Sequence, residues 1–296
     1  MAEIGAGIKL RASAKVNLTL EVLGERTDGY HELRSLVQCI SLADELTLRP
    51  AAEGITVSVR GEPAPEGPQN LCHTAATKFI EQVGSPAGVE IELVKHIPAG
   101  RGLGGGSSDA AATLLGLGEL VEEPPSQQQL HEMATELGSD VLLFLYGGVA
   151  AISGRGEQVQ GLTAQWGERA LVVAWPDLAI STAEAYGLLE RDDFTDGEIT
   201  AVAQQALAEG RLDAERHLFN CFQRAVCSRW PQVAKLQEDI TRICGAPAAL
   251  SGSGSAVFCI LPSLSEAEQT AAAVSQAGYR AVAVRPVEYG VRLVES

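Results

Sequence analysis

The sequence has few aromatic residues and no apolar run long enough to cross a membrane. Phe, Trp and Tyr make up 5% of its 296 residues. The longest apolar stretch, at 141–152, falls short of the roughly 20 residues that a transmembrane helix needs. The first residues show no basic segment followed by an apolar run, so we expect no signal peptide. We therefore expect a cytoplasmic protein that does not act in a membrane.

Positive charge is also scarce in this sequence. Its 22 Lys and Arg residues stand against 38 Asp and Glu, which gives a net charge of −16. A nucleic-acid-binding protein needs a basic surface, and so does a polybasic membrane anchor. Both classes are disfavoured, and any site for an anionic ligand must use local Lys or Arg side chains and backbone N–H groups.

The six cysteines do not have the spacing of a zinc site. No CxxC pair occurs, and without a secretory signal we expect reduced thiols, most of them small buried side chains. The histidines show no spacing with cysteine or carboxylate that indicates a metal. The sequence therefore leaves the metal ligands unassigned.

The apolar pattern mixes strands and helices in both halves of the chain. Residues 14–22 alternate, which predicts a half-buried strand with Lys15 and Asn17 on its polar face. We expect an α+β protein of two domains, covering residues 1–160 and 161–296. Further strands are expected at 45–50, 55–61, 89–97, 170–176 and 279–289, and helices at 70–83, from 107, and at 126–138, 196–209, 213–229, 231–243 and 265–278.

A glycine-rich segment between a predicted strand and a predicted helix carries the strongest chemical signal. The stretch PAGRGLGGGSSDAA, at 98–111, holds five glycines within seven residues. Such a backbone can turn several N–H groups toward one point, and the following helix adds its free N-terminal N–H groups. Ser107 and Ser108 can donate to phosphate oxygens, while Lys95 and Arg101 add positive charge. We therefore predict a phosphate site rather than a flexible turn with a serine cap.

Other phosphate-binding motifs fit this segment poorly. A Walker A loop needs a lysine before its Ser or Thr, and here Gly106 precedes Ser107. Gly100, Gly102 and Gly105 satisfy the dinucleotide pattern GxGxxG, but that match is weak in a run so rich in glycine. The HRD and DFG motifs of protein kinases are absent.

Three segments, in this order, resemble the motifs of the GHMP kinases, a family that includes galactokinase and the homoserine, mevalonate and phosphomevalonate kinases. They are ASAKVNLTLEVLGERTDGYHEL, PAGRGLGGGSSDAA and LSGSGSAVFCI, and the likeness runs along nearly the whole chain. The resemblance implies a ribosomal S5-like N-terminal domain and a ferredoxin-like C-terminal domain. It also implies a small-molecule kinase that uses ATP, and ATP chemistry in turn implies Mg²⁺, which neutralises charge on the phosphate oxygens.

The same resemblance implies that Asp140 accepts the proton of the substrate hydroxyl and that Lys15 orients it. Taken alone, these residues could equally form a structural ion pair, or be a capping aspartate and a surface lysine. The family usually has proline where this chain has Leu142, and often Asn where it has Asp109. A carboxylate suits a helix N-terminus but repels phosphate, so we expect Asp109 to point away from the loop.

The resemblance also implies the residues that bind the two substrates. Those for ATP are Asn70, Lys95, Pro98, Gly100, Gly102, Leu103, Gly104, Gly105, Gly106, Ser107 and Ser108. The combination of AKVNL, DGYHEL and LGSDV resembles a branch of the family whose small alcohol substrate carries a cytidine diphosphate head group. The matching substrate-binding residues are Asn17, Tyr30, His31, Thr182 and Tyr186. A kinase for another small alcohol and a non-catalytic ATP-binding homologue stay open as alternatives, as do a monomer and a homodimer.

Overall fold

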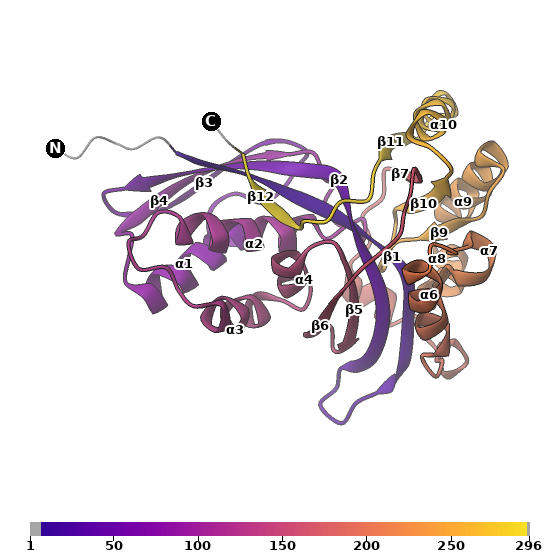
Figure 1. The fold of residues 1–296 in the computed structure, drawn as a ribbon, viewed down its shortest axis with the longest axis horizontal. Coiled ribbons are helices and arrows are strands. Elements are labelled where there is room, and N and C mark those ends of the chain that lie inside the picture. Colours follow the sequence, from indigo (N-terminus) through magenta and orange to yellow (C-terminus); the bar gives the residue numbers. More distant parts are fainter. Residues whose placement is uncertain (1–6, 295–296) are drawn as a thin grey trace.

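A long β-hairpin connects two units of the chain (Figure 1). In the computed structural model, which describes residues 7–294, strands β1 (Ile8–Glu25) and β2 (His31–Ala51) pair antiparallel over nearly their whole length. The predicted turn at Asp28-Gly29 joins them, and Gly29 has a φ of 82°, which favours glycine. The half of the hairpin nearer the turn lies beside α6 (Glu198–Ala208) of the second unit (Figure 1).

The first unit is a sheet with helices packed on one face (Figure 1). Its main strand order is β12-β1-β2-β4-β3; β5 pairs with β2 and β6, and β8 pairs with β1. The remaining elements of this unit are β3 (Gly54–Gly61), η1 (Gly67–Gln69), α1 (Leu71–Val83), β4 (Gly88–Lys95), α2 (Gly105–Gly118), α3 (Gln127–Leu137), α4 (Val141–Tyr146), β5 (Val149–Gly154), β6 (Gln158–Leu162), β8 (Phe219–Asn220) and β12 (Val291–Leu293).

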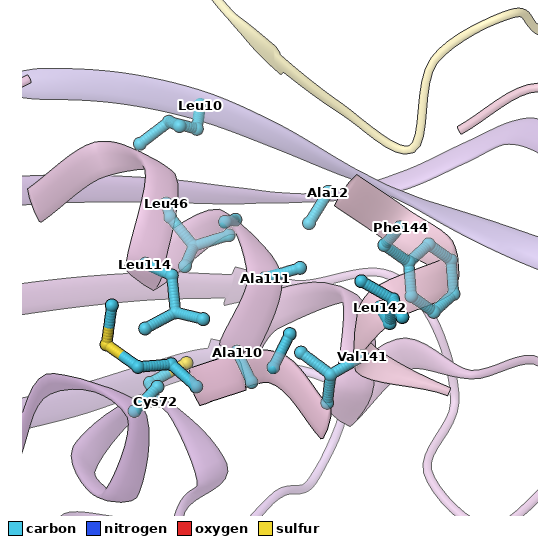
Figure 2. Packing of buried hydrophobic residues seen from close by; sticks show 14 of the residues in the cluster. Leu10, Ala12, Leu46, Cys72, Ala110, Ala111, Leu114, Val141, Leu142 and Phe144 are labelled. Carbon is cyan, nitrogen blue, oxygen red and sulfur yellow. The ribbon is translucent and has the colours of Figure 1, made fainter. Parts of the chain in front are cut away.

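Small residues let α2 pack closely against this sheet. Figure 2 shows Ala110 and Ala111 of α2 among apolar side chains from β1, β2 and α4. A Cβ atom at Gly116 would lie 2.8 Å from Leu10 Cδ1 and 3.0 Å from Leu48 Cδ2, so only glycine fits there without a shift. The close packing holds the N-terminus of α2, which follows the glycine loop, in a defined position.

The second unit has the topology predicted for the C-terminal half. Its sheet has the order β11-β7-β10-β9, and all neighbouring strands are antiparallel. In chain order these are the fourth, first, third and second strands, with helices α9 and α10 in the crossovers, which is the ferredoxin-like arrangement. The elements are β7 (Ala170–Trp175), α5 (Thr182–Tyr186), η2 (Arg191–Asp193), α6 (Glu198–Ala208), α7 (Ala214–His217), α8 (Phe222–Arg229), α9 (Pro231–Cys244), β9 (Ala248–Leu250), β10 (Val257–Leu261), α10 (Leu264–Gln276) and β11 (Arg280–Val284).

The predictions for residues 14–22 and 213–229 are only partly right. The strand at 14–22 is buried on both faces, because its polar face lies against α6 and the cleft described below instead of solvent. The helix predicted at 213–229 is split into α7, β8 and α8. Asn220 interrupts it: its Nδ2 donates to the backbone oxygens of Leu250 and Gly252, and its Oδ1 accepts from Phe222 N.

The two units are not separated by a single boundary in the sequence, because the chain returns to the first sheet near its C-terminal end. The predicted boundary at residue 160 falls inside β6, which pairs with β5 of the first sheet. The predicted final strand at 279–289 stops at Val284, and the chain then returns to the first sheet as β12 beside β1. Across residues 7–294, no helix combines the length and the apolar character that a membrane crossing requires.

Candidate active site

A cleft of about 830 Å³ lies between the two units. The glycine loop and the residues before α4 line one part of it, and the β1–β2 hairpin, α5 and the loop at 251–255 line the rest. Most of the predicted site residues meet there. They are Lys15, Asn17, Tyr30, His31, Pro98, Gly100, Gly102, Leu103, Gly104, Gly105, Gly106, Ser107, Asp140, Thr182 and Tyr186.

The glycine loop adopts a conformation that other residues rarely take. Gly100, Gly102 and Gly104 have φ values of 66°, 75° and 73°. A Cβ atom at Gly102 would lie 2.0 Å from the backbone oxygen of Ser251, which belongs to the second unit. At Gly104 it would lie 2.8 Å from the Phe144 ring. The loop is therefore closely packed against both units.

The loop leads directly into the N-terminus of α2. The N-cap residue of α2 is Gly104. Because glycine has no side chain, no N-cap oxygen accepts from the first N–H groups of the helix. Three backbone hydrogen bonds hold the loop, from Lys15 N to Leu103 O, from Ile180 N to Gly100 O and from Ala256 N to Arg101 O. A helix N-terminus behind a fixed loop of N–H groups is suited to bind phosphate.

Lys15 and Asp140 face each other across the cleft. Lys15 Nζ lies 3.8 Å from Asp140 Oδ2, with 6% of the lysine side chain and 41% of the aspartate side chain exposed. Burial lowers the pKa of Lys15, and the charge of Asp140 partly opposes that shift. Asp140 is the N-cap residue of α4, yet its side chain makes no capping hydrogen bond. The reading as a surface lysine and a capping aspartate is therefore wrong.

Hydrogen bonds along β1 hold Lys15 in place. Lys15 Nζ donates to Asn17 Oδ1 at 2.6 Å, and Asn17 Nδ2 donates to Ser35 Oγ at 2.9 Å. The strand places both side chains on one face because they are two residues apart. The lysine ammonium is thereby directed toward the cleft instead of the protein interior.

Aromatic side chains gather at another part of the cleft. The rings of His31 and Tyr186 lie 4.8 Å apart between centroids with an interplanar angle of 31°, and Tyr186 packs edge-on against Phe222. Tyr30 is 57% exposed, and the guanidinium carbon of Arg155 lies 4.8 Å from its ring centroid. Side chains from both the hairpin and α5 can therefore contact a flat group bound in this part of the cleft.

Three predicted ATP-binding residues do not line the cleft. Asn70 caps α1 by accepting from Cys72 N, and its amide donates to Pro65 O. Ser108 is buried in the first turn of α2, and its Oγ has no partner within the described residues. Lys95 is buried beneath the glycine loop, where a Cβ atom at Gly105 would lie 3.0 Å from its Nζ.

Lys95 belongs to a buried cluster of charges with Asp44 and Asp109. Its Nζ contacts Asp44 Oδ2 and lies 2.7 Å from Asp109 Oδ2, while Asp44 Oδ1 accepts from the backbone N–H groups of His96 and Ile97. Burial alone would lower the pKa of Lys95, but the two carboxylates hold it above its usual value. Burial also raises the pKa of Asp109, with Asp44 adding to the shift. Asp109 points away from the cleft, as expected, because it pairs with Lys95.

Several residues that line the cleft have no counterpart among the predicted ones. Ser35 accepts the hydrogen bond from Asn17, and Ser253 lies 3.4 Å from Thr182 between hydroxyl oxygens. Arg155 follows β5 in the turn Gly154–Gly156, and its position over Tyr30 depends on pairing between β2 and β5. Only the Gly-Arg-Gly turn could have drawn attention to Arg155 in the sequence.

No group of three or more His, Cys, Asp or Glu side chains in residues 7–294 could hold a metal ion. Ser107 and Asp140 are among the residues whose side-chain oxygens line the cleft. These are hard donors, which suit Mg²⁺ held mainly by nucleotide phosphates and water.

The glycine loop, the Lys15–Asp140 pair and the ferredoxin-like second unit define a GHMP-type small-molecule kinase. The family model described as the GHMP kinases N terminal domain matches residues 70–148, and that described as GHMP kinases C terminal matches residues 203–280.

Similar sequences and a similar solved structure show to which branch of the GHMP kinases the chain is related. A 4-diphosphocytidyl-2-C-methyl-D-erythritol kinase from Desulfitobacterium hafniense (strain Y51) is 38% identical over 96% of this chain and 97% of its own. One from Gloeobacter violaceus is 36% identical over 98% and 97%. A crystal structure of 4-(cytidine 5'-diphospho)-2C-methyl-D-erythritol kinase is 36% identical and superposes with a TM-score of 0.81, covering 93% of this chain and 98% of that chain.

The chain therefore belongs to the 4-diphosphocytidyl-2-C-methyl-D-erythritol kinase family of the GHMP kinases. It is an ATP-dependent small-molecule phosphotransferase of isoprenoid biosynthesis. A homoserine kinase from Cytophaga hutchinsonii shares the fold at 20% identity, with a TM-score of 0.75 and coverage of 99% of each chain.

Proposed function

We propose that this kinase transfers the γ-phosphoryl group of ATP to the 2-hydroxyl of 4-diphosphocytidyl-2-C-methyl-D-erythritol, in the non-mevalonate isoprenoid pathway. The observation that carries the proposal is one cleft that the Lys15–Asp140 pair shares with a glycine loop and an aromatic subsite. The names of its relatives supply the substrate. The reaction requires a phosphate site, a proton acceptor and a site for the head group, and each has candidate residues.

The glycine loop and α2 bind the ATP phosphates in this proposal. Backbone N–H groups from Gly102 to Ser107 surround the phosphates, and the N-terminus of α2 stabilises their charge. Ser107, together with phosphate oxygens and water, would hold Mg²⁺. The metal neutralises charge on the phosphate oxygens when it is bound.

Asp140 accepts the proton of the 2-hydroxyl as the phosphoryl group is transferred. Its side chain is partly exposed to the cleft and is not occupied in capping α4, so its carboxylate is available to a substrate hydroxyl. Lys15 orients Asp140 and offsets negative charge at the reacting centre. Asn17 fixes Lys15 through the 2.6 Å hydrogen bond.

The aromatic subsite binds the cytidine diphosphate head group. Tyr30 and Tyr186 stack on cytosine, which has a flat π-face, and His31 pairs with the polar edge of the base through its backbone and ring. Thr182, at the start of α5, binds the substrate from the second unit, where its hydroxyl lies near Ser253. The exposure of Tyr30 and the contact between His31 and Tyr186 support this assignment.

An ADP-release assay with a panel of alcohols tests the proposal. We expect turnover of the cytidine diphosphate substrate and little turnover of free methylerythritol, homoserine or mevalonate. Asp140→Asn protein serves as the control for contaminating kinases. Equal turnover of free methylerythritol would refute the head-group assignment, and absence of turnover with every alcohol would favour the non-catalytic alternative.

We also propose that the enzyme acts in the cytoplasm as a monomer or homodimer. The six cysteines are free thiols, which suits a reducing compartment. Sedimentation of the purified enzyme over a range of concentrations distinguishes the two oligomeric states.

A further inference from the structure

Two cysteines meet in the second unit, away from the residues assigned to catalysis. Cys244 is the last residue of α9, and Cys259 lies in β10. Their Sγ atoms are 2.6 Å apart. Unbonded sulfur atoms do not normally approach so closely, and a disulfide holds its sulfurs at about 2.03–2.05 Å. Little movement therefore separates this thiol pair from a covalent bond.

We propose that Cys244 and Cys259 are a modification site at which the thiol pair is reversibly oxidised to an intrachain disulfide. The proposal does not depend on the identity of the alcohol substrate. It rests on the contact of the two thiols and on the separate positions from which α9 and β10 bring them together.

The two thiols differ in access, which sets the order of reaction. Cys244 is half-buried at the end of α9, whereas Cys259 is fully buried in the sheet. A disulfide oxidant such as oxidised glutathione meets Cys244 first. The Cys244 thiolate attacks one glutathione sulfur, the glutathione S–S bond breaks, and one glutathione thiolate leaves with the electron pair.

Cys259 then completes the reaction. Its thiolate attacks the Cys244 sulfur of the mixed disulfide and releases the second glutathione. In total the protein loses two protons and two electrons, and one oxidised glutathione becomes two reduced molecules. Thiol reductants reverse both steps, so the bond responds to the redox state of its surroundings.

The bond would enclose a segment that reaches the cleft. The two cysteines are 15 positions apart, and the residues between them include β9 and the loop at 251–255. Gly252 and Ser253 of that loop line the cleft, and Ser251 Oγ donates to Gly102 O of the glycine loop. A crosslink therefore restrains the backbone segment that supports the cleft from the second unit. It also reduces the freedom of the unfolded chain, which stabilises the fold.

The test compares the full-length enzyme after incubation at pH 8 with oxidised glutathione or with dithiothreitol. Acid quenching, denaturation and alkylation then count the free thiols, and peptide mapping locates any disulfide. We expect the oxidised protein to lose two alkylated thiols, to yield a peptide pair joined through Cys244 and Cys259, and to unfold at a Tm about 5 °C higher. Dithiothreitol should reverse all three changes.

Variants assign the effect to this pair. Cys227→Ser is the matched control, because Cys227 is also half-buried but lies in α8, and it should keep all three changes. Cys244→Ser should lose them. Cys259→Ala should retain a glutathione adduct on Cys244, because no second thiol displaces it. Six alkylated thiols in the oxidised wild type would overturn the proposal, as would a disulfide between other cysteines; both measurements need only the wild-type protein.

Discussion

Replacing Gly102 with alanine tests whether contact between the glycine loop and the second unit sets the geometry of the phosphate site. Gly102 has a φ of 75°, and an alanine there costs about 1–2 kcal/mol in backbone strain. Its Cβ would also lie 2.0 Å from Ser251 O. Since Cβ atoms do not approach an oxygen closer than about 3 Å, the two loops must separate by about 1 Å.

A displacement of that size is large for a catalytic site, where about 1 Å of misplacement can reduce the rate about 100-fold. We expect Gly102→Ala to lower kcat/KM for ATP by roughly 10- to 100-fold. From the strain alone, the Tm should fall by about 2–8 °C. Steady-state kinetics at varied ATP and thermal unfolding of the same preparation measure both effects.

Gly84→Ala provides the matched control. Gly84 ends α1 with a φ of 78°, and no atom lies within 4 Å of the position its Cβ would take. It therefore carries the strain without the collision, and should lower the Tm by a similar amount while leaving kcat/KM unchanged. Equal kinetics in Gly102→Ala and wild type would refute the reasoning, because the loops would then tolerate separation without loss of function.

Three further substitutions test other parts of the site. Asp140→Asn should lower kcat by roughly 10²–10⁴ with a much smaller change in KM, as expected for a lost general base, and near-normal kcat would make Asp140 structural. Tyr30→Ala should raise KM for the cytidine diphosphate substrate by about 5- to 150-fold through lost stacking, with KM for ATP unchanged; lost stability with a normal KM would indicate packing alone. Lys95→Met should destabilise the fold by about 3–5 kcal/mol, because it leaves buried carboxylates without their cation. Since burial raises the pKa of Asp109, its proton is bound more tightly in the folded state, so unfolding of the Lys95→Met protein should show stability rising as the pH falls from 7 to 5. Stability that does not change with pH in this variant would contradict the raised pKa of Asp109.

Elements whose signals are local were predictable from the sequence. Both ends of α3 have local sequence signals. Ser126 and Gln129 form a reciprocal capping box at its start, and Gly138 ends it. The glycine loop was predictable because its backbone needs positive φ values, which glycine adopts readily. The spacing of Lys15 and Asn17 likewise placed both on one strand face.

The helix predicted at 213–229 depends on distant contacts instead. Asn220 binds backbone oxygens at Leu250 and Gly252, about 30 positions further along the chain. Helical periodicity in a short window contains no information about those partners. Residues 219–220 also pair with β1, so that tertiary contacts replace helical hydrogen bonds at this point.

The contacts of Lys95 differ from those that its position in the sequence predicts. In an acidic chain, a lysine beside a glycine loop is naturally interpreted as a ligand for phosphate. The structure gives that lysine two buried carboxylates, one of which also accepts backbone N–H groups from His96 and Ile97 just before the loop. Asp109 lies in the first turn of α2, just after the loop, so Lys95 connects its two ends. In the proposed mechanism, the charge of Lys95 then acts on the shape of the loop, and the backbone N–H groups that this shape presents bind the phosphates.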